Sequence, residues 1–65
     1  MVTITIAHPN RHAQGRWQVF GTRESGEDHF VFAVKEFPRD RQDLAEEYAR
    51  ELVEKHQADH LERLA

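Results

Sequence analysis

Only one segment of this chain has the apolar periodicity of a helix, and it follows three segments that alternate like strands. From Leu44 to Val53 the apolar side chains recur at helical spacing and form one stripe. A single amphipathic helix must bury its stripe, and in a 65-residue chain the only available partner is the preceding sheet. The sequence therefore predicts one α+β domain over residues 1–65, a three-stranded antiparallel sheet with one C-terminal helix packed on one face.

Turn-forming residues separate the three strands, which are predicted at residues 2–7, 16–22 and 29–36. The pair Ser25 and Gly26 has the composition of a hairpin turn between the second and third strands. This order predicts a meander in which consecutive strands are neighbours.

The helix is predicted to begin with Asp40 as its N-cap and to continue to about residue 57. A helix of that length already spans the sheet, so residues 57–65 are expected to overhang it. Leu61 and Leu64 lie off the apolar stripe. Two outcomes stay open for this end of the helix: it frays, or it contacts a second copy in a homodimer.

Strict alternation assigns every strand residue to one face of the sheet. The predicted core is Val2, Ile4, Ile6, Trp17, Val19, Phe30, Phe32, Val34, Leu44, Tyr48, Leu52 and Val53. The face away from the helix is predicted to carry Thr3, Thr5, Arg16, Gln18, Phe20, Thr22, His29, Val31, Ala33 and Lys35, and no carboxylate. This face is interpreted either as a solvated surface or as a binding surface that meets phosphates and stacks on a base.

The segments "GRWQVFGT", "HFVFAVKEF" and "DLAEEYAREL" give the chain a resemblance to known DNA-binding domains. Over about residues 15–57 it resembles the small domains of the plant ethylene-response-factor type and of phage integrase arms. That resemblance implies an open sheet face inserted into the major groove. The nucleic-acid contacts expected from it and from the open face are Arg16, Gln18, Phe20 and Lys35, with Arg11 and Arg23 at the strand ends. So few cations predict weak, salt-sensitive binding.

A second resemblance is one of style. Compact, acidic, cysteine-free domains are similar to the small inhibitors, such as anti-CRISPR proteins, that phages and mobile elements use against nucleic-acid-handling complexes. Such inhibitors mask a protein surface or occlude a basic groove with carboxylates. This alternative would use the open sheet face or the polar side of the helix, where the candidate residues are Glu46, Glu47, Glu51 and Glu54.

Composition favours a binding protein over an enzyme. The chain has no cysteine and has 12 acidic against 9 basic side chains, with a net charge of −3. It has no glycine-rich phosphate loop and no sequence motif of a catalytic serine, so no cofactor is expected. His8 and His12, and likewise His56 and His60, are four residues apart, but the sequence fixes no third metal ligand beside either pair, so no metal is expected. The sequence thus predicts a cytoplasmic, non-catalytic module that binds nucleic acid or a nucleic-acid-handling protein complex, with no membrane association.

Overall fold

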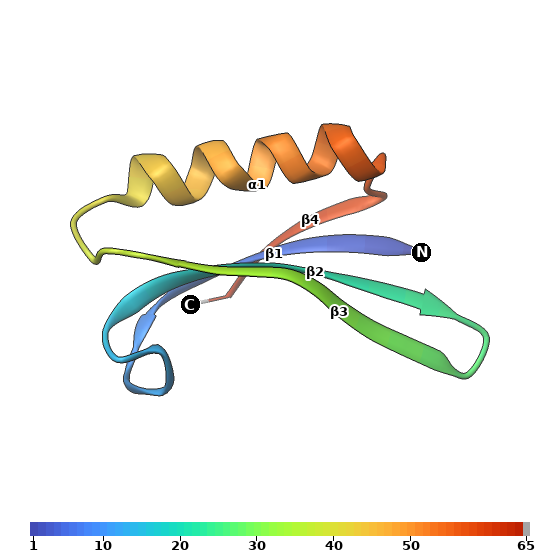
Figure 1. The fold of residues 1–65 in the computed structure, drawn as a ribbon, viewed down its shortest axis with the longest axis horizontal. Helices are drawn as coiled ribbons and strands as arrows, with labels where there is room; N and C mark the ends of the chain where they lie inside the picture. The colour runs from blue at the N-terminus through green and yellow to red at the C-terminus, as the bar shows by residue number, and fades with distance from the viewer. Residues whose placement is uncertain (65) are drawn as a thin grey trace.

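The computed structural model describes residues 1–64, which form one α-helix packed on a four-stranded sheet (Figure 1). The elements are β1 (Val2–Asn10), the short 3₁₀ helix η1 (Arg11–Ala13), β2 (Arg16–Ser25), β3 (Asp28–Phe37), α1 (Gln42–His56) and β4 (His60–Leu64). The spatial order is β3-β2-β1-β4, with β4 parallel to β1 and the other pairs antiparallel. The α+β class is confirmed, but the three-stranded antiparallel sheet is wrong because the sheet is mixed and has a fourth strand.

The fourth strand occupies the segment that was predicted to be an overhanging helix end. Gln57 adopts a left-handed backbone conformation with φ 49°, which ends α1 at His56. The chain then turns back: the N–H of Asp59 donates to the carbonyl of Val2 (2.8 Å), and the N–H of Val2 donates to the Asp59 carboxylate (2.9 Å). The prediction of an overhanging or frayed helix end is therefore wrong for residues 57–64, and residue 65 lies outside the described residues.

The helix begins at Gln42, with Arg41 and not Asp40 at the N-cap position. Arg41 makes no capping hydrogen bond, but its guanidinium donates to the carboxylate of Asp43 at 3.1 Å from both Nε and Nη2. Asp43 lies in the first turn, where the helix dipole favours a negative charge.

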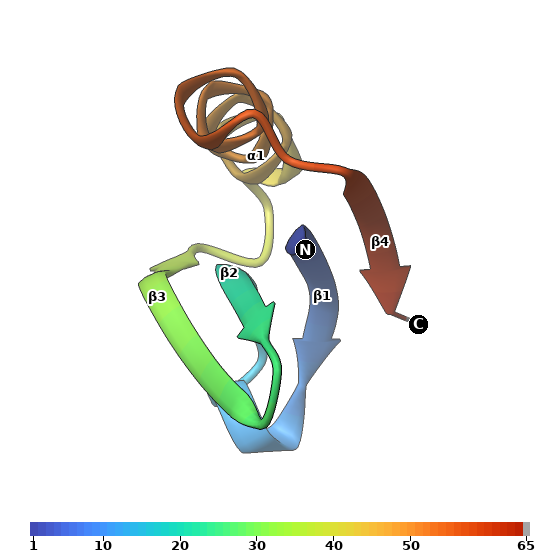
Figure 2. The ribbon, with the colours of Figure 1, turned by 90° about the vertical axis from the view of Figure 1, so that its right-hand side faces the viewer.

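The core lies between α1 and one face of the sheet (Figure 2). Ile4 and Ile6 of β1 and Val19 of β2 are fully buried. Ala45 and Ala49, one turn apart on α1, have no exposed surface, because small side chains let the helix backbone approach the strands closely. Trp17 closes one end of the core and donates its indole N–H to the carbonyl of Arg39 at 2.9 Å.

A bulge in β3 changes which residues of that strand reach the core. Val19 of β2 pairs with Lys35 and Gly21 pairs with Phe32, so two residues of β3, Ala33 and Val34, lie opposite one residue of β2. Ala33 has φ 56°, and its carbonyl accepts a hydrogen bond from the Tyr48 hydroxyl at 3.2 Å.

Beyond the bulge the alternation is reversed, so three predictions for β3 are wrong. Val34 is exposed and not in the core, and Lys35 lies on the helix side and not on the opposite face. Phe37, which the core prediction omitted, is buried in contact with the Tyr48 ring. Phe30 was also predicted in the core but is 56% exposed. It pairs with Arg23 near the turn of the β2–β3 hairpin, and this hairpin extends past the end of α1 (Figure 1).

Candidate functional site

The face of the sheet away from α1, called the open face below, has no element of residues 1–64 packed against it (Figure 2). Strand pairing assigns residues from all four strands to this face. They are Thr3, Thr5, Ala7, Arg16, Gln18, Phe20, Thr22, Glu24, His29, Val31, Val34, Glu36, His60, Glu62 and Leu64.

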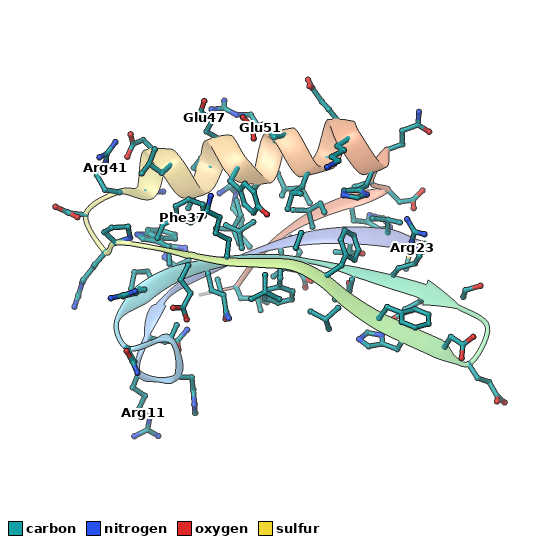
Figure 3. The ribbon with its side chains drawn as sticks, in the orientation of Figure 1. Arg11, Arg23, Phe37, Arg41, Glu47 and Glu51 are labelled. Carbon is teal, nitrogen blue, oxygen red and sulfur yellow. The ribbon has the colours of Figure 1, made fainter. Side chains whose placement is uncertain are left out.

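The six predicted nucleic-acid contacts do not lie together. Arg16, Gln18 and Phe20 lie on the open face, on alternate residues of β2. Arg11 lies in η1 and points away from the helix, beside that face (Figure 3). Lys35 lies on the helix side of the sheet, so the prediction that it shares the open face with Arg16 is wrong. Arg23, which was predicted as a contact at a strand end, also lies on the helix side.

Lys35 and Arg23 are each held near aromatic rings on the helix side. The ammonium nitrogen of Lys35 lies 5.1 Å from the centre of the Tyr48 ring and 5.5 Å from that of Phe37. The guanidinium carbon of Arg23 lies 6.0 Å from the centre of the Phe32 ring, within the range of cation–π attraction. The bulge accounts for Lys35, and the alternation from Gly21 to Arg23 accounts for Arg23.

The charge of the open face is acidic and not basic. Glu24, Glu36 and Glu62 lie on it, and among residues 1–64 strand pairing places a single arginine, Arg16, and no lysine there. Arg16 Nη1 lies 4.0 Å from Glu36 Oε1, and His29 Nδ1 lies 3.4 Å from Glu24 Oε1. These pairs are exposed, so salt and solvent weaken them strongly.

Sequence reasoning missed all three of these carboxylates for different reasons. Glu24 lies beyond the predicted end of the second strand at residue 22, but β2 continues to Ser25. Glu36 reaches the open face only because the bulge reverses the alternation after Ala33. Glu62 reaches it because β4 is a strand and not a helix end, and its residues are all exposed, so no apolar alternation marks it.

Apolar side chains accompany this charge. Val31 and Val34 are each 55% exposed and Leu64 is 43% exposed. Phe20 is half-buried beside Thr5, a polar residue that is nevertheless buried at the centre of the face. The open face thus has apolar groups on β2, β3 and β4 with glutamates between and around them.

The four glutamates on the polar side of the helix have different environments. The carboxylate of Glu46 accepts hydrogen bonds from both terminal nitrogens of Arg63 on β4, and these bonds lower the pKa of Glu46. Glu47 and Glu51 point away from the sheet, and Glu54 is also exposed (Figure 3). Three of the four predicted carboxylates are therefore presented to solvent.

Two further findings on residues 1–64 concern metal ligands and membrane-spanning helices. No three histidine, aspartate or glutamate side chains gather there closely enough to hold a metal ion. The single helix in this part of the chain is too short and too polar to cross a membrane. Comparison with known proteins adds no assignment: no family model, no curated protein and no solved structure matches this chain significantly.

Proposed function

We propose that this protein is a non-catalytic binding module whose open face docks on another protein. One observation carries the proposal: an uncovered sheet face with exposed Val31, Val34 and Leu64 also bears three glutamates. Exposed apolar groups with polar surroundings are typical of protein interaction surfaces. The complementary partner has apolar groups at the contact and basic side chains around them.

The electrostatics favour a protein partner over nucleic acid. A phosphate backbone meets mainly arginine and lysine, and each glutamate on the contacting surface opposes it. The open face has Glu24, Glu36 and Glu62 against Arg16, whereas Arg23 and Lys35 lie on the opposite side of the sheet. Proteins that handle nucleic acids carry basic surfaces, so they form the partner class that this face fits best.

The proposal can be tested with a photo-cross-linking residue introduced into the intact protein at Gln18, at the centre of the open face. The matched control places the same residue at Glu47, which points to solvent from the helix (Figure 3). In cell extract we expect a discrete protein adduct from position 18 and none from position 47. Reversing the charge of Glu36 and Glu62 to lysine should weaken that adduct, because these carboxylates attract the basic rim of the partner.

Two other outcomes would overturn this assignment. An adduct from position 47 alone would place binding on the acidic side of the helix. Salt-sensitive binding of purified protein to duplex or single-stranded nucleic acid, weakened by Arg16→Ala, would favour a nucleic-acid function instead.

A further inference from the structure

The first half of β3 is an exposed sheet edge with apolar side chains on both faces. Within residues 1–64 β3 pairs only with β2, so its outer backbone N–H and C=O groups have no strand beside them there. Phe30 is 56% exposed on the helix side and Val31 is 55% exposed on the open face. Proteins usually protect such an edge with charged residues, proline or a bulge, but residues 28–32 precede the bulge and pair regularly with β2.

We propose that this edge pairs with β3 of a second copy of the chain, to form an antiparallel dimer with a twofold axis at Val31. A twofold axis perpendicular to the sheet places side chains of the same face opposite each other. Val31 then lies opposite Val31 of the second copy, and Phe30 lies opposite Phe32 in both directions. Every apolar residue of this segment meets another apolar residue.

The charges of the hairpin fit the same register. Asp28 alternates with Phe30 and Phe32 and so lies on the helix side, as Lys35 does. With the axis at Val31, Asp28 of one copy lies opposite Val34 of the other by residue count, and the neighbouring Lys35 is the side chain that shares its face. In residues 1–64 the Lys35 ammonium has no carboxylate within ion-pair distance, so the second copy supplies a partner of opposite charge.

A shallow hollow on the helix side gives the incoming aromatic ring a place to pack. It has a volume of about 360 Å³ and is lined by Arg23, Phe30, Phe32 and His56. The His56 ring packs edge-on against Phe32, with ring centres 4.8 Å apart. In the dimer Phe30 of the second copy lies beside Phe32, at this hollow. Beyond Phe32 the bulge bends the strand, which limits the length of the paired segment.

Because the chain has no cysteine, a single introduced cysteine reports the register directly. Residues directly opposite in an antiparallel pair have Cα atoms about 4.5–5.5 Å apart, within the range that a disulfide bridges. Val31→Cys should therefore form a disulfide-linked dimer in a glutathione redox buffer. The control is Val34→Cys, which is equally exposed but would lie about 20 Å from its own counterpart, and it should form no disulfide-linked dimer.

Sedimentation velocity of the unmodified protein should show a monomer–dimer equilibrium in the micromolar range, since the paired segment is short. Val31→Lys should weaken dimerisation by about tenfold or more, because it places two like charges opposite each other at the axis. Leu64→Lys, on the other sheet edge, should leave the equilibrium unchanged. Circular dichroism of both variants checks that each is folded.

Three results would overturn the proposal. The protein could remain monomeric up to millimolar concentration, the dimer could respond to Leu64→Lys and not to Val31→Lys, or Val34→Cys could cross-link as readily as Val31→Cys. The oligomeric state is measured without any other partner, so its outcome is independent of the proposed docking function.

Discussion

At Ala33 the alternation of β3 side chains between the two faces of the sheet is reversed. Its left-handed backbone, φ 56°, is a conformation that side chains other than glycine seldom adopt. The Tyr48 hydroxyl donates to its carbonyl and so fixes the bulge to the helix. Because of the bulge at this residue, Phe37 lies in the core and Glu36 lies on the open face.

Gly21 is required by a close contact and not by its backbone angles. A Cβ atom at this position would lie 2.6 Å from Cε2 of the Phe32 ring, which packs flat over the glycine from the neighbouring strand. Gly21→Ala should therefore displace the ring and lower the free energy of unfolding by about 1–3 kcal/mol. Urea denaturation monitored by circular dichroism measures this change.

A double-mutant cycle identifies the cause of that loss. Phe32→Leu removes the ring, so Gly21→Ala should cost clearly less in the Phe32→Leu background than in the original protein. Equal costs in both backgrounds would show that the contact with Phe32 is not what excludes a side chain at position 21.

At the scale of elements, β4 is attached to the domain by few groups apart from its pairing with β1. Arg63 donates to Glu46 of the helix, and Asp59 accepts from the N–H of Val2 just before the strand. The hydrogen bonds from Arg63 and from Val2 lower the pKa values of Glu46 and Asp59. All five residues of β4 are exposed, so these polar contacts matter more here than in the buried strands.

These lowered pKa values give β4 a dependence on acid. A carboxyl group whose pKa is lower in the folded state stabilises that state at pH values above its unfolded-state pKa. The stabilisation is lost as the pH falls through the lowered, folded-state pKa. Hydrogen exchange of the β4 amides should therefore accelerate, relative to that of the β2 amides, as the pH falls through the acid range of carboxyl titration.

Glu46→Gln isolates the contribution of the ion pair. The variant should have weaker protection of β4 at neutral pH and a flatter dependence on acid, because its side chain does not titrate. Glu47→Gln changes a neighbouring carboxyl that points to solvent, so it should leave the profile as it was. Identical profiles for the two variants would contradict a role for the Arg63 contact.

The elements that could be predicted from sequence are those in which buried apolar residues recur at the spacing of a helix or a strand. The stripe of α1 and the alternation of β1 and β2 are strong signals, and both appear in the structure. In β3 the run "HFVFAVKEF" has apolar residues at both odd and even positions, which point to opposite faces of a strand. Its pattern therefore cannot reveal a bulge in the middle of the strand. In β4 neither face is buried, so an edge strand had no periodic signal to distinguish it from a frayed helix.

The same limit explains how far the candidate site could be predicted. The uncovered face and its β2 residues Arg16, Gln18 and Phe20 follow from one amphipathic helix and one alternating strand. The charge of the face could not be predicted. It depends on Glu36 and Glu62, which reach the face through the bulge and the fourth strand.

At the scale of the whole molecule, β4 makes β1 a central strand. Without β4, β1 would be a sheet edge, although it contains Ile4 and Ile6 of the core. Deletion of residues 60–65 should therefore lower the free energy of unfolding by about 1–3 kcal/mol, because the β1–β4 hydrogen bonds and the Arg63 contact are lost together.

The urea midpoint of the truncated chain measures this loss. It should exceed the loss caused by Glu46→Gln alone, which removes only one of these contacts. An unchanged midpoint would show that the segment contributes as little as a frayed end would.

The pairing of β1 with β4 also determines what a partly opened form of the domain exposes. β4 lies at an edge of the sheet, whereas β1 contributes Ile4 and Ile6 to the core. Local opening that releases β4 alone therefore leaves the helix on the core and gives β1 an unpaired edge. Because an unpaired strand edge is a template for pairing with other chains, this opened form is the one from which aggregation is expected to begin.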